Sequence, residues 1–93
     1  MIRTVHVSIV GYVQGVGYRA WTVRAASARG LSGWVRNRRD GRVEAVFSGD
    51  AALIDEMLEA CRSGPPAAAV ESVTVEDEQA ERPEPGFRAL ATI

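Results

Sequence analysis

The spacing of apolar residues changes period several times along this chain of 93 residues, and that order restricts the possible folds more than any other feature. Apolar and polar residues alternate over residues 5–10, which predicts a half-buried strand. From residue 18 the apolar positions recur at helical spacing. The predicted buried face of this helix carries Tyr18, Trp21, Ala25 and Ala28. Gly30 then stands where a glycine that ends a helix is expected.

The rest of the chain follows with short elements separated by turn residues. Two strands, around residues 34–37 and 42–48, flank an Asp-Gly turn at 38–41, which predicts a hairpin. Asp50 is a suitable N-cap for a second helix, which we expect to end at Gly64-Pro65-Pro66. Its predicted apolar stripe is Leu53, Ile54, Met57, Leu58 and Cys61. A strand at residues 70–75, an exposed acidic loop at 76–86 and a last edge strand at 87–93 complete the prediction.

The predicted order is β-α-β-β-α-β with an extra C-terminal strand. This order is typical of the α+β, ferredoxin-like split βαβ sandwich, in which two helices pack on one face of an antiparallel sheet. We expect the strand that ends at Asn37 to lie beside the first strand. The opposite face of the sheet, with His6, Ser8 and Glu44, is expected to meet solvent. Val46 shares that predicted face.

Length and composition add limits on the class of protein. Residues 1–93 are expected to form a single domain, and no apolar run approaches the roughly 18 residues of a membrane-spanning helix. We expect a cytoplasmic monomer that contacts neither membrane nor nucleic acid. The lone cysteine, Cys61, permits no internal disulfide.

All eleven cationic residues are Arg. Residues 1–46 carry a net charge of +6, and residues 47–93 carry a net charge of −7. Arg suits a phosphate ligand, although an Arg-biased genome would give the same composition.

The segment of residues 11–19 is the strongest candidate for chemistry. It has three glycines in seven residues and leads from a strand directly into a helix. Free backbone N–H groups and the helix dipole favour an anion at such a position. Arg19 in the first helical turn opposes that dipole, so a bound phosphate would explain its presence. The alternative is a glycine-rich turn with an exposed Arg, because one such loop is a weak motif.

Asn37 lies in a second candidate segment, residues 33–44. Its side-chain amide can accept a hydrogen bond from water and donate one to an oxygen at the same time. Asn is also a common turn residue, so Asn37 could simply begin the hairpin. We expect His6 to be inert and Cys61 to be a buried, unreactive thiol.

Taken together, the two segments resemble the acylphosphatase family, whose signatures read G-x-V-Q-G-V-x-F-R and G-[WY]-V-x-N-x-x-x-G-x-V with a later Gly. The matching positions are Gly11, Val13, Gln14, Gly15, Val16 and Arg19, then Gly33, Trp34, Val35, Asn37, Gly41, Val43 and Gly49. The resemblance continues through Gly64-Pro65 and residues 70–73, and so covers nearly the whole chain. Tyr18 replaces the usual Phe, and its added hydroxyl needs a hydrogen-bond partner.

The resemblance implies an acylphosphatase that hydrolyses the carboxyl–phosphate bond of an acyl phosphate, without cofactor or metal, to a carboxylate and inorganic phosphate. Arg19 would hold the phosphate together with the loop of Gln14, Gly15, Val16, Gly17 and Tyr18, and Asn37 would orient the attacking water. Acetyl phosphate, 1,3-bisphosphoglycerate and carbamoyl phosphate all contain this anhydride, so the substrate stays open. Because an acyl phosphate is already activated, positioning and electrostatics can supply most of the acceleration.

Three alternatives belong to other functional classes. An RNA-binding module on the same fold would need aromatic side chains on a basic sheet face. The predicted open face, at His6, Ser8, Glu44 and Val46, has no aromatic platform. A silent regulatory domain would not need both Arg19 and Asn37. A phosphate-handling part of a larger carbamoyl-transfer enzyme is also possible, but we expect a stand-alone chain.

Overall fold

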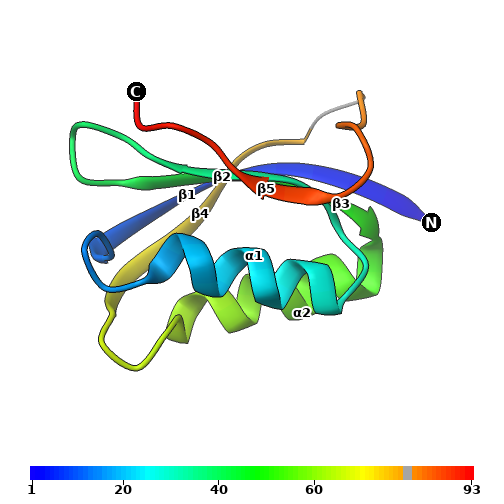
Figure 1. Cartoon of the computed structure of the whole chain (residues 1–93). Helices are drawn as coiled ribbons and strands as arrows, with labels where there is room; N and C mark the ends of the chain where they lie inside the picture. The colour runs from blue at the N-terminus through cyan, green and yellow to red at the C-terminus, as the bar shows by residue number, and fades with distance from the viewer. Residues whose placement is uncertain (79–80) are drawn as a thin grey trace.

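The computed structural model describes residues 1–78 and 81–93 and contains a five-stranded sheet with two helices on one face (Figure 1). The elements in chain order are β1 (Ile2–Tyr12), α1 (Tyr18–Ala28), β2 (Ser32–Asn37), β3 (Val43–Asp50), α2 (Ala51–Ser63), β4 (Ala69–Glu78) and β5 (Phe87–Ala89). This arrangement confirms the predicted ferredoxin-like α+β fold.

The order of strands differs from the prediction in one respect that matters for the site. The sheet order is β4-β1-β3-β2-β5, so β3 lies between β1 and β2 and the two strands are not neighbours. The crossover through α1 skips one position, and the hairpin then brings β3 back into the gap, antiparallel to both strands. The expectation that the strand ending at Asn37 lies beside the first strand is therefore wrong.

The last strand also differs from the prediction of an antiparallel sheet. β5 has three residues and pairs in parallel with β2, with Val35 opposite Ala89, so the sheet is mixed. The chain beyond β5 still follows β2, because Leu90 N–H donates to Val35 O at 2.8 Å and Ile93 N–H donates to Asn37 O at 3.3 Å. The C-terminal segment therefore runs along β2 as far as Asn37.

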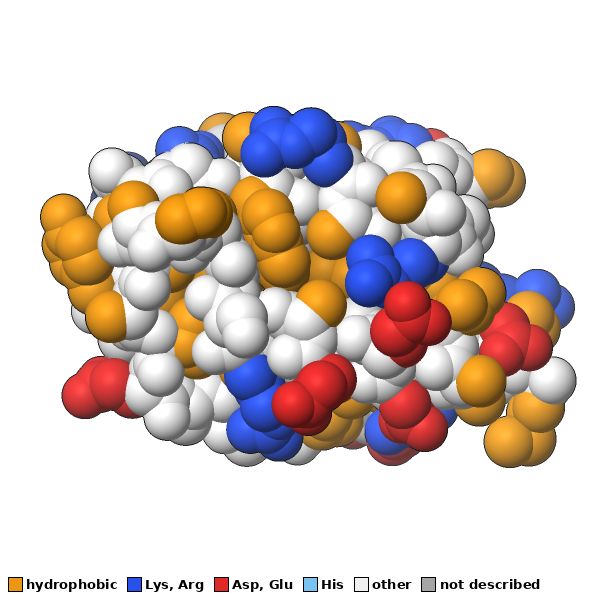
Figure 2. All heavy atoms as spheres, turned by 90° about the horizontal axis from the view of Figure 1, so that it is seen from below, with side chains coloured by type: hydrophobic (Ala, Val, Ile, Leu, Met, Phe, Trp, Pro, Cys, Tyr) orange, Lys and Arg blue, Asp and Glu red, His pale blue; other side chains and the backbone are white. Residues whose placement is uncertain are grey.

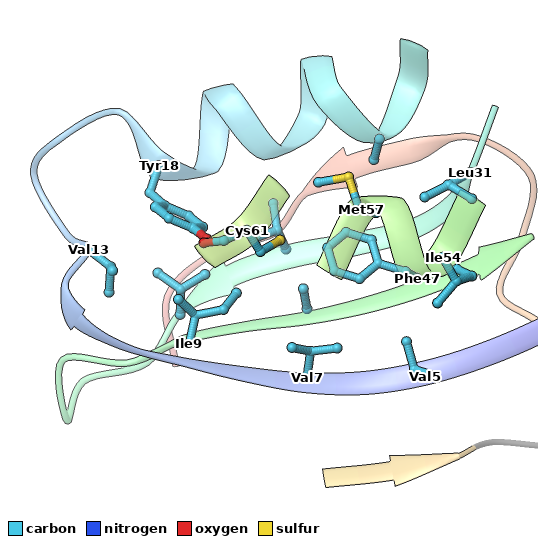
Figure 3. Packing of buried hydrophobic residues seen from close by; sticks show 14 residues of the cluster. Val5, Val7, Ile9, Val13, Tyr18, Leu31, Phe47, Ile54, Met57 and Cys61 are labelled. Carbon is cyan, nitrogen blue, oxygen red and sulfur yellow. The ribbon is translucent and has the colours of Figure 1, made fainter. Parts of the chain in front are cut away.

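The core lies between the helices and the sheet (Figure 3). Val5, Val7 and Ile9 point from β1 toward the helices and are fully buried, as the alternation predicts. On α1 the buried residues are Tyr18, Thr22 and Ala26, whereas Ala28 is exposed, so the helix is rotated from the predicted face. Thr22 tolerates burial because its hydroxyl donates to the Tyr18 carbonyl at 2.8 Å.

Local signals place the second helix as expected. The Asp50 carboxylate accepts a hydrogen bond of 3.0 Å from the Ala52 N–H, which is the predicted N-cap. Ile54, Met57 and Cys61 are buried. Gly64 ends the helix with φ 62°. Neither α1, with 11 residues, nor α2, with 13, is long enough to cross a membrane.

The uncovered sheet face is less open than predicted. Ser8 is buried, and Arg42 Nη1 donates to its hydroxyl at 3.1 Å. His6 Nε2 and Glu44 Oε2 are hydrogen-bonded, and both side chains are only partly exposed; Arg38 also contacts Glu44. Long side chains therefore cover the short polar ones on this face.

The aromatic side chain of Trp34, which the prediction did not place here, also lies on this face. Trp34 pairs with Val46, which in turn pairs with His6, so all three point to the same side. The Arg36 guanidinium lies 5.0 Å from the Trp34 ring centre. A tryptophan ring that an arginine covers gives no stacking platform for several bases.

The predicted acidic loop at 76–86 begins later than expected. Its first three residues belong to β4, where Glu78 pairs with Val5 and its carboxylate accepts from Arg3 at 2.7 Å. Residues 79–80 of that predicted loop lie outside the described residues. Figure 2 views the helix-covered side and shows acidic and basic side chains intermixed. The opposite charges of the two halves of the sequence are thus mixed on this face rather than separated.

Candidate active site

A pocket of about 330 Å³ lies at the N-terminal end of α1. The loop after β1, the first turn of α1, the end of β2 and the end of β5 all contribute to it. Its lining residues are Val13, Gly15, Gly17, Tyr18, Arg19, Ala20, Asn37 and Ala89. The structure thus brings Arg19 and Asn37, which the sequence suggested from separate segments, to one cavity.

The loop and the first turn of α1 contain backbone N–H groups that the helix does not use. Gly15 and Gly17 have φ of 74° and 80°, a left-handed conformation that favours glycine. The first helical hydrogen bond runs from Trp21 N–H to Gly17 O at 3.0 Å, so the N–H groups of residues 18–20 have no partner within the helix. The first turn of α1 contains no acidic residue. The positive end of the helix dipole and these free donors together favour an anion here.

Arg19 is the charged side chain of the pocket. It is half-buried and lines the cavity from the first turn of α1. Six other arginines form ion pairs with carboxylates: Arg3, Arg29, Arg38, Arg42, Arg62 and Arg88. Within residues 1–78 and 81–93, Arg19 forms none. Its guanidinium can therefore supply a fork of donors to an anionic ligand.

Asn37 is the last residue of β2 and is only 8% exposed. Its backbone is held on both sides, because it pairs with Val43 of β3 and its carbonyl accepts from Ile93 N–H. Its side-chain Oδ1 is buried and has no hydrogen-bond partner in the described protein. A buried acceptor without a partner costs about 1–3 kcal/mol, so a donor that enters the pocket would be bound favourably.

Two predicted loop residues do not line the pocket. Gln14 turns its amide nitrogen toward the β2–β3 hairpin, where it donates to Arg38 O at 2.7 Å and Arg42 O at 3.0 Å. Val16 packs against the core. Gly15, Gly17, Tyr18 and Arg19 do line it. The predicted loop therefore divides into residues that face the cavity and residues that support it.

Tyr18 satisfies the hydrogen-bonding requirement that its sequence position raised. The ring is buried, and the hydroxyl donates to the Cys61 carbonyl at 2.6 Å (Figure 3). Burial raises the pKa of the Tyr18 hydroxyl well above its usual range. Burial also raises the pKa of the Cys61 thiol to about 12, so the predicted burial of Cys61 is confirmed and its thiol stays protonated near neutral pH.

Three lining residues were not predicted as site residues, although Val13 is a position of the family signature. Val13 and Ala20 flank the glycine loop and carry no chemical signal of their own. Ala89 reaches the pocket only because β5 pairs with β2, a long-range contact that no local pattern reveals. These three side chains are apolar and belong to the pocket wall. Among residues 1–78 and 81–93, no three His, Cys, Asp or Glu side chains gather into a metal-binding group.

Comparison with known proteins gives consistent matches. The family model described as Acylphosphatase matches residues 5–89. An acylphosphatase of Azorhizobium caulinodans is 56% identical over 95 residues, covering 100% of both chains. The solved structure of an acylphosphatase from Coxiella burnetii has a TM-score of 0.91 at 35% identity and covers 96% of this chain and 93% of that one. The crystal structure of acylphosphatase from Bacillus subtilis has a TM-score of 0.88 at 33% identity, covering 97% and 99%.

Proposed function

The chain belongs to the acylphosphatase family of enzymes, which hydrolyse acyl phosphates, and on that premise we propose how its own residues carry out the reaction. The phosphate group of the substrate binds at the N-terminal end of α1. Backbone N–H groups of residues 15–19 and the Arg19 guanidinium donate to its oxygens. Asn37 orients the water that attacks phosphorus.

The phosphate position is supported by the free donors around the pocket. The N–H groups of residues 18–20 have no partner within the helix, and the helix dipole adds positive potential at the same point. Arg–phosphate hydrogen bonds are charge-assisted and bidentate in the favourable geometry. As negative charge shifts among the phosphoryl oxygens during transfer, these preorganised donors stabilise it without rearrangement.

The water position is supported by the buried Oδ1 of Asn37. An amide oxygen accepts a hydrogen bond from water and leaves a water lone pair free to attack. The bond from the water oxygen to phosphorus forms while the bond from phosphorus to the acyl oxygen breaks. The carboxylate departs with that electron pair, and the proton of the water passes to a phosphate oxygen of the substrate. The products are a carboxylate and inorganic phosphate.

This mechanism asks no side chain to act as a general base. The described pocket lining contains no His, Cys, Asp or Glu. A carboxylate is a good leaving group, so orientation and electrostatic stabilisation can provide most of the acceleration. The observation that carries the proposal is that Arg19 and Asn37 line one pocket at the N-terminal end of α1, and that the buried Oδ1 of Asn37 has no hydrogen-bond partner in the described protein.

The test is hydrolysis of benzoyl phosphate in the presence of a chelator by the wild type and by Arg19→Ala and Asn37→Ala. Arg24→Ala is the matched control, because Arg24 is exposed on the same helix and does not line the pocket. We expect Asn37→Ala to lower kcat by roughly 100-fold. Arg19→Ala should lower kcat/KM by at least as much, and Arg24→Ala should have a kcat/KM near that of the wild type.

A folded Asn37→Ala variant with wild-type kcat would show that Asn37 has no part in the mechanism. Loss of wild-type activity on chelation would contradict metal independence.

A further inference from the structure

Gln14 connects the phosphate loop to the hairpin that carries Asn37. Its Nε2 donates to Arg38 O at 2.7 Å and to Arg42 O at 3.0 Å. Both acceptors are carbonyl oxygens, which cannot donate, so the nitrogen end of the amide must face them. Both hydrogens of that nitrogen are then used, and the side chain is held at two points.

The two carbonyls lie in the hairpin turn that joins β2 to β3, directly beyond Asn37. Asn37 and Val43 form the last pair of the β2–β3 ladder, and Arg38 N–H donates to Arg42 O at 2.8 Å just beyond it. The Arg42 carbonyl thus accepts from both Arg38 and Gln14. Gln14 therefore links the phosphate loop to Arg38, the residue that directly follows Asn37.

The topology makes such a link necessary. β3 separates β1 from β2, so no ladder hydrogen bond joins the strand that leads into the phosphate loop to the strand that ends at Asn37. Arg19 is held by the loop and α1, whereas Asn37 is held by β2 and the C-terminal segment. In-line attack needs the water and the phosphate aligned to within a fraction of an ångström. The two halves of the site must therefore be connected by side chains.

We infer that Gln14 is a positioning residue: it contacts no reacting atom and sets the placement of Asn37 relative to the phosphate loop. The inference rests on the proposed role of Asn37. It predicts that loss of the two hydrogen bonds lowers kcat while substrate binding is largely kept, because the loop N–H groups and Arg19 remain.

The experiment uses Gln14→Met, which keeps the length of the side chain and removes both donors. Benzoyl phosphate kinetics give kcat and KM, inhibition by inorganic phosphate reports on the phosphate site, and thermal unfolding reports on the fold. We expect kcat to fall between about 10-fold and 100-fold, with KM and the phosphate inhibition constant within about twofold of wild type. Gln14→Glu, which also lacks both donors, is a second variant if Gln14→Met does not fold.

A double-mutant cycle with Asn37→Ala separates positioning from a general structural role. If Gln14 acts through Asn37, adding Gln14→Met to Asn37→Ala lowers kcat little further. A full additional loss in that background would overturn the inference, as would a wild-type kcat for both Gln14 variants. Wild-type activity of Asn37→Ala alone would instead refute the proposed role of Asn37, so the two failures are distinguishable.

Discussion

The hydroxyl of Tyr18 donates a 2.6 Å hydrogen bond to the main-chain carbonyl of Cys61 and thereby joins the first turn of α1 to the last turn of α2. Within a helix this carbonyl would accept from the residue four positions later, which is Pro65 and has no N–H. Tyr18 therefore satisfies an acceptor that the helix itself cannot. The residue that departs from the family pattern has a structural role here.

Tyr18→Phe is expected to lower the free energy of unfolding by about 1–3 kcal/mol, because it leaves the buried Cys61 carbonyl without a donor. Urea denaturation measures this change. Tyr12→Phe is the control, since Tyr12 is 64% exposed and should unfold as the wild type does. Equal midpoints for the two variants would mean that the hydrogen bond contributes nothing to stability.

Alkaline pH should destabilise the protein through Cys61. Burial raises the pKa of this thiol from 9.0 to about 12, so above pH 9 the unfolded chain loses a proton that the folded chain keeps. The folded state then binds more protons, and stability falls as pH rises from about 9 to 12, by at most about 1.4 kcal/mol per pH unit for this group. Urea unfolding at several pH values tests this, and Cys61→Ala should show a shallower dependence. An identical slope in both proteins would exclude Cys61 as the cause.

Gly17→Ala and Gly30→Ala form a matched pair at the two ends of α1. Both glycines have positive φ, 80° and 68°, and an added Cβ would meet no atom within 4 Å at either position. Each substitution should cost about 1–2 kcal/mol of stability from backbone strain alone. Gly17 lines the pocket, so we expect only Gly17→Ala to lower kcat/KM for benzoyl phosphate, because the loop N–H groups shift. Comparable activity of the two variants would argue against a loop with one required geometry.

Inorganic phosphate should stabilise the folded protein by binding at the α1 N-terminus. At a concentration near ten times its Kd, phosphate adds about 1.4 kcal/mol, which raises Tm by about 5 °C or more in a chain of this size. Arg19→Ala should lose most of this shift, and Arg24→Ala should retain it. Chloride at matched ionic strength controls for salt effects, and an equal shift in both variants would contradict the role of Arg19.

Local features of this protein could be predicted from its sequence because their causes lie within a few residues. The Asp50 cap, the glycine that ends α2, the Asp-Gly hairpin turn and the order of elements all follow from short-range spacing and turn chemistry. The two candidate segments were found in the same way, since a glycine-rich helix entry and a polar strand end are local patterns. Their placement around one pocket was not determined by those patterns.

Only the tertiary structure decided which segments meet. In the folded chain β3 lies between β1 and β2. β5 pairs in parallel with β2, and this pairing places Ala89 in the pocket. The tertiary structure also gave the Gln14 amide its two carbonyl partners and buried Thr22 in place of Ala28. Each of these contacts joins residues through packing or strand pairing rather than through local spacing. The local spacing of apolar residues identifies which face of a helix or strand is buried. Which other element packs against that face depends on contacts between residues far apart in the sequence.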